Sequence, residues 1–284
     1  MTLKIKYNKL KSILKQMGQV VIAYSGGVDS TFLLKAATDE LGTGNVKAIL
    51  ATSPSYPSRE FKRAIEVARK MGVNVDLIET KELEDPKFSN NPVNRCYFCK
   101  FELFEKIAAL ISGQDIHNMV DGSNYDDLSD HRPGMLALKE RNVRSPLQEA
   151  GLTKADIREL SRQMRLPTWE KDSLACLSSR FPYGEKIDLK KLQMVDEAEN
   201  FLVSLGFNNI RARHEKNTLR IEITPGQIKL LLDDELRIRL VKKMKEIGYT
   251  YISLDLEGYR QGSLNETTKK PRHTTGLTID RLSV

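Results

Sequence analysis

The stretch from Gln19 to Ser30, QVVIAYSGGVDS, decides the fold of the chain. Its first six residues form an apolar, partly β-branched run that is typical of a buried strand, and a glycine pair follows. From Val28 to Leu41 the apolar residues recur at helical spacing. We therefore expect a strand, a tight glycine turn and a helix, which together form the first unit of a parallel α/β sheet.

Further strands and helices alternate through the next part of the chain. We expect strands at 46–52, 74–80 and 117–121, and helices at 59–71, 97–111 and 153–164, the last with Thr153 as its N-cap. This alternation predicts a parallel sheet with helices on both faces, and such sheets bind ligands beyond the carboxyl ends of their strands. Three polar loops follow predicted strands and should meet there: Ser25–Ser30, Ser53–Tyr56 and Gly122–Asp127.

The pattern changes after Pro182. Long helices are expected at 188–205 and 227–247, and short strands at 209–214, 219–224 and 251–255. This mixture predicts a smaller α+β domain. We therefore expect a first domain at 1–182, a second at 183–268 and a tail at 269–284 to which no role is assigned.

The composition is that of an ordinary globular protein. The chain has 284 residues, of which 40% are hydrophobic and 29% charged, and its net charge of +7 suits a phosphate-bearing substrate, RNA or simply a solvated basic surface. No apolar run approaches the roughly 20 residues that cross a bilayer. Met1–Met17 contains five lysines and predicts an amphipathic helix instead of a signal peptide. We expect a cytoplasmic protein without a membrane partner.

The glycine loop has the chemistry of a phosphate site. Gly26 and Gly27 let main-chain N–H groups approach an anion, and the helix that follows adds its positive end. Ser25 and Ser30 supply hydroxyl donors. Asp29 would repel bound phosphates unless a cation lay between them, so it indicates Mg²⁺. The loop is neither a GK[ST] nor a GxGxxG motif, and the alternative is a tight turn with a polar cap.

Three cysteines, Cys96, Cys99 and Cys176, suggest a metal or a reactive site. An odd number in a cytosolic chain argues against a disulfide framework, and CxxC alone fits zinc, an iron–sulfur cluster or a redox dithiol. Zinc would need a fourth ligand such as His117 or His131, and a redox dithiol would leave Cys176 without a role. Three thiolates on a [4Fe–4S] cluster would leave one iron open to a ligand such as sulfide, and we favour this interpretation.

The glycine loop resembles the pyrophosphate loop of the N-type ATP pyrophosphatases, which include GMP synthetase, NAD synthetase and tRNA-thiolating enzymes. From about Val20 to Asn265 the chain resembles the LarE family of ATP-dependent sulfur transferases, which build the nickel-pincer nucleotide cofactor of lactate racemase. The motifs that carry this resemblance are AYSGGVDST (23–31), DHRPG (130–134), SPLQEAGLTKADIREL (145–160), ACLSSRFPYGEKI (175–187), EAENFLVSLGF (197–207) and LDLEGYRQGSLNE (254–266).

The resemblance implies a mechanism. ATP would be cleaved between its α and β phosphates to adenylate a carboxylate of pyridinium-3,5-dicarboxylate mononucleotide, and sulfur would then displace AMP. Some family members give up the sulfur of one cysteine at the position of Cys176, whereas others hold a [4Fe–4S] cluster with three cysteines. Cys96 and Cys99 place this chain with the second kind, so the cluster ligands would be Cys96, Cys99 and Cys176.

The resemblance also implies roles for individual residues. Cys176 and Asp29 would be catalytic. The expected ATP-binding residues are Ala23, Ser25, Gly26, Gly27, Asp29, Ser30, Ser53, Asp121, Gly122 and Arg132. The substrate phosphate would be bound by Arg180, Arg211 and Arg213, with Glu199 and Glu222 orienting those arginines or binding the ribose. Without the resemblance, Arg211 and Arg213 would suggest only the solvated face of a strand. The second domain would bind substrate and support a homo-oligomer.

Two other functions are compatible with these motifs. A tRNA-thiolating enzyme would share the loop and the cysteines, but no appended RNA-binding module and no basic stripe with aromatic residues is visible, so a nucleic-acid partner is not expected. An ATP-gated iron–sulfur or zinc carrier would bind the same ligands without releasing AMP and pyrophosphate. The donor of the sulfide is not identified by any motif.

Overall fold

Alternating side chains of the first strand, β1 (Val20–Ala23), fill two different cores. Val20 and Ile22 pack into one cluster, whereas Val21 packs into another. Because successive side chains of a strand point to opposite faces, both faces of this sheet are buried, as a parallel sheet requires.

The first sheet has four parallel strands, which confirms the prediction. The structure is a computed structural model that describes residues 1–114, 116–129, 133–172, 175–260 and 262–264. The strands β1, β2 (Val46–Thr52), β3 (Val75–Glu79) and β4 (Met119–Val120) have the order β3-β2-β1-β4. Since β2 and β4 lie on opposite sides of β1, the strand order changes direction at β1. Open α/β sheets bind ligands at such a point, and the glycine loop begins there.

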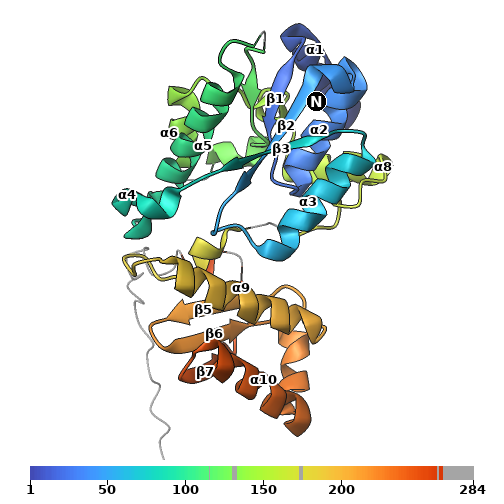
Figure 1. The fold of residues 1–284 in the computed structure, drawn as a ribbon. Helices are drawn as coiled ribbons and strands as arrows, with labels where there is room; N and C mark the ends of the chain where they lie inside the picture. The colour runs from blue at the N-terminus through green and yellow to red at the C-terminus, as the bar shows by residue number, and fades with distance from the viewer. Residues whose placement is uncertain (115, 130–132, 173–174, 261, 265–284) are drawn as a thin grey trace, which may run out of the picture.

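Helices cover both faces of this sheet, as predicted (Figure 1). One face packs against α1 (Leu3–Met17), α2 (Val28–Leu41), α3 (Ser58–Lys70) and α8 (Lys154–Gln163), and the other against α5 (Arg95–Ile111) and α6 (Gly134–Glu140). Two further helices are short: α4 (Pro86–Ser89) precedes α5 in the chain, and α7 (Pro146–Glu149) precedes α8. Thr153 and Asp156 form the predicted cap of α8 as a reciprocal capping box. No helix in the described part of the chain has both the length and the apolar character needed to cross a membrane.

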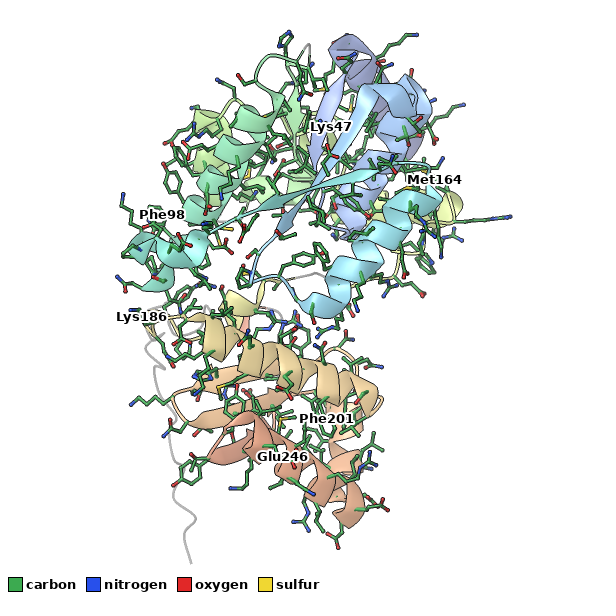
Figure 2. The ribbon with its side chains drawn as sticks, in the orientation of Figure 1. Lys47, Phe98, Met164, Lys186, Phe201 and Glu246 are labelled. Carbon is green, nitrogen blue, oxygen red and sulfur yellow. The ribbon has the colours of Figure 1, made fainter. Side chains whose placement is uncertain are left out.

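The second lobe has its own sheet and its own core (Figures 1 and 2). Strand β6 (Thr218–Glu222) pairs antiparallel with β5 (Arg211–Glu215) and parallel with β7 (Tyr251–Leu254). Helices α9 (Leu189–Ser204) and α10 (Asp234–Ile247) pack on this sheet through residues such as Phe201. The predicted smaller α+β unit is confirmed. Its core already includes Leu177 and Phe181, which precede the change of pattern after Pro182.

The single long helix predicted at 227–247 is wrong. A 3-10 helix spans Pro225–Leu232, and α10 begins only at Asp234. Asp233 separates them because it has an extended ψ of 124°, and its side chain accepts a hydrogen bond from the Leu236 N–H at 2.8 Å. An N-cap aspartate therefore separates two helices that the apolar spacing predicted as one.

The two lobes are joined by hydrogen bonds next to the strand ends. Asn91 is fully buried at a positive φ of 54°, donates from its side chain to the Pro182 carbonyl at 2.7 Å and accepts from the Gly184 N–H at 2.9 Å. On the other side, Ser58 at the start of α3 donates its N–H to Asp196 of α9 at 3.2 Å. These contacts bring the segment after Cys176 and the start of α5 to the same junction.

Candidate active site

The glycine loop has a geometry that only glycine permits at its centre. Gly26 has a φ of +61°, and a Cβ at this position would lie 2.4 Å from the Cβ of Ala64. Gly27 is the N-cap of α2 and offers no side chain to cap it. An anion placed there would therefore meet main-chain N–H groups at the positive end of a helix of 14 residues.

Two side chains bind the main-chain carbonyls of this loop: Tyr56, which belongs to the predicted loop Ser53–Tyr56, and Lys171, which was not predicted. Tyr56 donates its hydroxyl to the Ser25 carbonyl at 2.6 Å, and Lys171 donates to the Gly26 carbonyl at 2.8 Å. Lys171 is also paired with Glu60 at 2.6 Å, and both side chains are largely buried. Because the C=O and N–H of a peptide unit point in opposite directions, fixing these carbonyls directs the next N–H groups to the other side of the loop.

Asp29 has one oxygen paired and one without a partner. Its Oδ2 accepts from Lys154 at 2.6 Å, whereas its Oδ1 is buried and accepts no hydrogen bond from the described residues. Burial raises the pKa of this carboxyl, and the charge of Lys154 opposes the shift. A buried carboxylate oxygen without a donor beside a phosphate-binding loop suits a divalent cation such as Mg²⁺. Lys154 was not predicted. The sequence could have indicated it, because a lysine at the first position of a helix is disfavoured by the helix dipole.

The glycine loop and two of the cysteines line the same cavity at the strand ends, which we call the loop cavity. This cavity has a volume of about 180 Å³, and its lining includes Ala23, Ser25, Ser53, Cys99 and Cys176. The structure therefore brings together residues that lie far apart in the sequence. Glu82, which was not predicted, is buried. It accepts a hydrogen bond from the Ser53 hydroxyl and another, at 2.8 Å, from the Ser55 hydroxyl.

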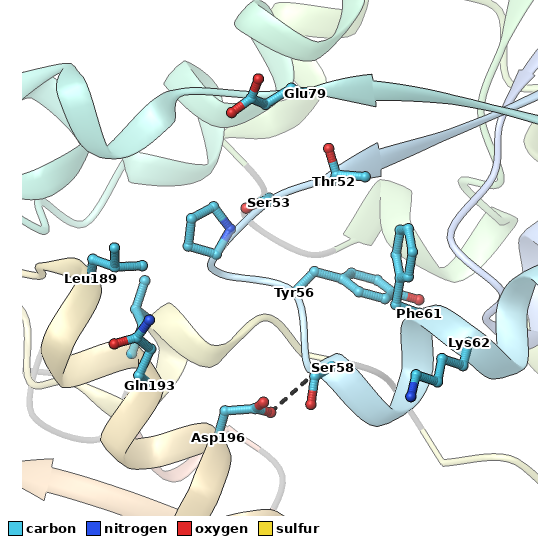
Figure 3. A pocket seen from close by; sticks show the side chains of 12 residues that line it. Thr52, Ser53, Tyr56, Ser58, Phe61, Lys62, Glu79, Leu189, Gln193 and Asp196 are labelled. Atoms are coloured by element: carbon cyan, nitrogen blue, oxygen red, sulfur yellow. Dashed lines mark hydrogen bonds between the residues drawn. The ribbon is translucent and has the colours of Figure 1, made fainter.

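A larger cavity of about 600 Å³ adjoins it and shares Ser53 and Tyr56 with it (Figure 3). Its walls come from the ends of β2 and β3, the start of α3 and one side of α9. Figure 3 shows Gln193 and Asp196 of α9 on one side and Thr52 and Ser53 on the other. The space next to the loop thus extends across the junction between the lobes.

The three cysteines lie in one region but differ in exposure. Cys96 is exposed at the start of α5, whereas Cys99 and Cys176 are partly buried. Burial raises the pKa of the Cys99 thiol, and the charges of Glu82, Cys176 and Cys96 raise it further. Within the described ranges, no three histidine, cysteine, aspartate or glutamate side chains form a group that would hold a metal ion.

The predicted polar loop Gly122–Asp127 lies directly beside the glycine loop. A Cβ on Gly122 would be 3.0 Å from the main-chain nitrogen of Ser30. Asp121 is buried, and its two oxygens accept from Ser123 and Ser145 and contact Lys100 at 3.2 Å. Asp121 therefore holds the loop in place with groups of the protein itself. The predicted residue Arg132 and the histidine His131 lie outside the described residues.

Arg180 lies at the junction of the lobes, as expected, but its side chain is buried and bonded to other groups of the protein. Its side chain is 1% exposed and forms a bidentate ion pair with Glu199 at 2.8 and 3.0 Å. It also donates to the carbonyls of Ala175 and Cys176 at 2.8 and 3.0 Å. Although burial acts to raise it, the charge and hydrogen bonds of Arg180 lower the pKa of Glu199 to about 2. Arg180 thus fixes the segment that carries Cys176, because most of its donors are already used.

Arg211 and Arg213 line a second cavity of about 180 Å³ at the junction of the lobes. Arg213 is paired with Glu222 at 2.8 and 2.9 Å and donates to the Ser179 carbonyl at 2.7 Å. The guanidinium of Arg211 lies 4.6 Å from the ring centroid of Tyr259. Further lining side chains are those of Arg95, Ser179, Tyr183 and Arg260. We call this the arginine cavity, and its excess of cations suits an anionic ligand.

Comparison with known proteins supports an ATP-using enzyme. A family described as NAD synthase matches residues 3–92, which contain the glycine loop. The chain is 35% identical to the pyridinium-3,5-bisthiocarboxylic acid mononucleotide synthase of Lactiplantibacillus plantarum, a LarE protein, over 96% of this chain and 99% of that protein. The chain belongs to the LarE family. As a LarE-family protein it is an ATP-dependent sulfurtransferase.

Other relatives extend the match in two ways. The chain is 44% identical to an uncharacterised protein of Synechocystis over 94% of this chain and all of that protein. It is 32% identical to the glutamine-dependent NAD(+) synthetase of Aquifex aeolicus, but only over 30% of this chain and 13% of that protein. LarE-type similarity thus covers both lobes, whereas this NAD synthetase match covers less than a third of the chain.

One segment of the LarE-family chain contacts both cavities. Cys176 lines the cavity next to the glycine loop, and Ser179 and Tyr183 line the arginine cavity. Arg180 is buried among the main-chain carbonyls between them. The segment 175–183 therefore connects the place where ATP is expected to the place where an anion is expected.

Proposed function

We propose that this protein uses ATP and Mg²⁺ to adenylate a carboxylate of pyridinium-3,5-dicarboxylate mononucleotide, and that sulfur then replaces the AMP to give a thiocarboxylate. The observation that carries this proposal is the segment 175–183, which lines the loop cavity through Cys176 and the arginine cavity through Ser179 and Tyr183. The name of the Lactiplantibacillus plantarum relative supplies the substrate class.

In the first step a carboxylate oxygen attacks the α phosphorus of ATP. The new P–O bond forms as the bond from this phosphorus to the bridging oxygen breaks, and pyrophosphate leaves. The N–H groups around Gly26 and Gly27 and the hydroxyls of Ser25 and Ser30 would bind the departing phosphates. Asp29 would hold Mg²⁺ through its unpartnered Oδ1, and the cation would offset the charge of the pyrophosphate.

In the second step a sulfur lone pair attacks the carbonyl carbon of the adenylate, and AMP leaves with the bonding electrons of its C–O bond. Cys176 lies on the wall of the loop cavity, so it is the residue that would bear or present this sulfur. Arg180 would act on this step only by holding the carbonyls of Ala175 and Cys176. Arg211 and Arg213 would bind the phosphate of the mononucleotide in the arginine cavity.

We further propose that Cys96, Cys99 and Cys176 hold a [4Fe–4S] cluster, on the basis of three thiols of which Cys96 and Cys176 are near enough to raise the pKa of Cys99. As they stand, the described side chains do not form a group of three metal ligands, and no step above is routed through a cluster. The second possible sulfur source is the thiol of Cys176 itself. Its attack would give a thioester, and β-elimination would then release the thiocarboxylate: the Cβ–S bond breaks, the Cα proton leaves, and the cysteine becomes dehydroalanine.

The activity is tested with purified protein, Mg-ATP and the dicarboxylate mononucleotide. We expect release of AMP and pyrophosphate, together with a product in which sulfur has replaced a carboxylate oxygen, detected by mass spectrometry. The Cys176→Ser variant should still form the adenylate but no thiocarboxylate. Release of AMP without any sulfur in the product of the wild-type protein, or thiocarboxylate from Cys176→Ser, would contradict the proposal.

The sulfur source is tested separately on protein purified without oxygen. The cluster predicts about four irons per chain with matching acid-labile sulfide, both lowered in Cys96→Ser and Cys99→Ser. Colourless protein whose Cys176 loses the mass of H₂S after turnover, about 34 Da, would instead establish the cysteine itself as the donor.

A further inference from the structure

Arg95 is held in a place that opposes a positive charge. It is the first residue of α5, a helix of 17 residues that has no acidic residue in its first turn. The positive end of a helix disfavours a cation, and burial disfavours any charge. Nevertheless the Arg95 side chain is only 4% exposed. Such a residue costs stability, which indicates that something other than folding explains its presence.

Only some of the hydrogen-bond donors of the Arg95 guanidinium have a partner among the described residues. Its Nη1 donates to the side-chain oxygen of Asn91 at 2.9 Å, and its guanidinium lies 4.9 Å from the ring centroid of Tyr183. Its Nε is buried and has no hydrogen-bond partner among the described residues. No carboxylate of the described chain forms an ion pair with it, whereas Arg180 and Arg213 each have one. Buried cations are ordinarily paired, so Arg95 has no anionic partner within the part of the chain that the structure describes.

Arg95 faces the arginine cavity, where a second residue has a matching arrangement. Arg211 lies over Tyr259 as Arg95 lies over Tyr183, and within the described residues Arg211 also has no carboxylate ion pair. The two arginine–tyrosine pairs come from different parts of the chain. They supply two guanidinium groups that form no ion pair with a carboxylate of the described residues. The guanidinium of Arg213, in contrast, is paired with Glu222.

We propose that Arg95 binds the second carboxylate of the substrate, the one that is not being adenylated. This assignment rests on the proposed function. A pyridinium dicarboxylate mononucleotide has three anionic groups: its phosphate is assigned to Arg211 and Arg213, and one carboxylate must reach ATP. The remaining carboxylate matches a guanidinium, which binds carboxylates through two parallel hydrogen bonds. Arg95 is therefore the residue that selects a dicarboxylate.

The test compares two ligands by calorimetry in the absence of ATP, so that sulfur chemistry does not enter. One is the dicarboxylate mononucleotide, and the other is a pyridinium mononucleotide that has a neutral carboxamide and no carboxylate. Arg95→Met should raise the Kd of the dicarboxylate about 10- to 100-fold, the usual effect of losing a charge-assisted hydrogen bond in a buried site. It should change the Kd of the carboxamide less than about threefold. Arg211→Met, the matched control, should weaken both ligands by a similar factor.

Four outcomes separate the possibilities. Equal weakening of both ligands in Arg95→Met would overturn the assignment, because Arg95 would then bind the phosphate or only support the fold. Unchanged binding of the dicarboxylate would also overturn it. Arg95→Lys keeps the charge but not the paired donors, so an intermediate Kd for the dicarboxylate alone would support it. If the wild-type protein binds the carboxamide but not the dicarboxylate, the proposed substrate fails, and Arg95 loses its assignment with it.

Discussion

The glycine loop and the arginine cavity both suit anions, but they are built in opposite ways. The loop uses main-chain N–H groups and short side chains from one continuous segment, and its Gly26 tolerates no side chain. The arginine cavity uses long side chains from separate segments, and Glu222 cancels the charge of one of them. In the loop the backbone conformation decides whether an anion binds. In the cavity the decisive quantity is the number of arginines that have no carboxylate partner within the described residues.

The largest expected effect comes from Gly26→Ala. The new methyl group would meet Ala64 at 2.4 Å, and the residue would keep an unfavourable positive φ. Displacing the loop by about 1 Å should lower ATP-dependent AMP release at least about 100-fold. Gly44→Ala is the control, since a Cβ there has no heavy atom within 4 Å, and it should behave as wild type. Near-normal ATP turnover in Gly26→Ala would show that the backbone conformation does not control this site.

Glu199→Gln should have the largest effect on stability. It leaves Arg180 buried without its counter-charge, which costs about 3–5 kcal/mol and lowers the Tm by about 10 °C. Thermal unfolding measures it. The control is Glu159→Gln, which breaks an exposed pair with Arg162 and should leave the Tm nearly unchanged. Equal destabilisation in the two variants would mean that burial of the pair at Glu199 is unimportant.

The same pair predicts a pH dependence. The pKa of Glu199 is about 2 in the folded protein against an ordinary value of 4.5, so its stabilising contribution is complete above pH 4.5 and is lost as the pH falls toward 2. This contribution is roughly 3 kcal/mol. Stability measured by denaturant unfolding should therefore fall more steeply below pH 4.5 in the wild-type protein than in Glu199→Gln. Parallel curves for the two proteins would contradict the assignment.

The smallest of these effects concerns Lys171, which supports the loop from behind. Lys171→Met removes the charge-assisted hydrogen bond to the Gly26 carbonyl, an interaction worth about 1.5–3 kcal/mol. We expect weaker binding of Mg-ATP by about 10-fold or more, measured by calorimetry. Lys35→Met, on the exposed side of α2, is the control and should leave the Kd unchanged. An unaltered Kd in Lys171→Met would show that the loop holds its shape without this contact.

Much of the fold could be predicted because local patterns decide it. Apolar periods and glycines placed α2 and β2 at their observed bounds, and Thr153 marked the start of α8. The helix expected at 227–247 failed because periodicity does not register a cap such as Asp233 inside an apolar repeat. Lys154 and Arg95 were missed, although each begins a helix with a charge that its dipole disfavours, and this is a signal that a sequence can show.

By itself, the sequence determined the layered α/β fold, the glycine loop after β1 and membership of the LarE family, because these depend on contiguous residues and local conformation. Only the tertiary structure decided how the arginines divide. Arg180 and Arg213 are paired with buried glutamates, whereas Arg95 and Arg211 face the arginine cavity over tyrosine rings. The physical reason is that the effect of a charge depends on its burial and on its partner, and both come from segments that are distant in the chain.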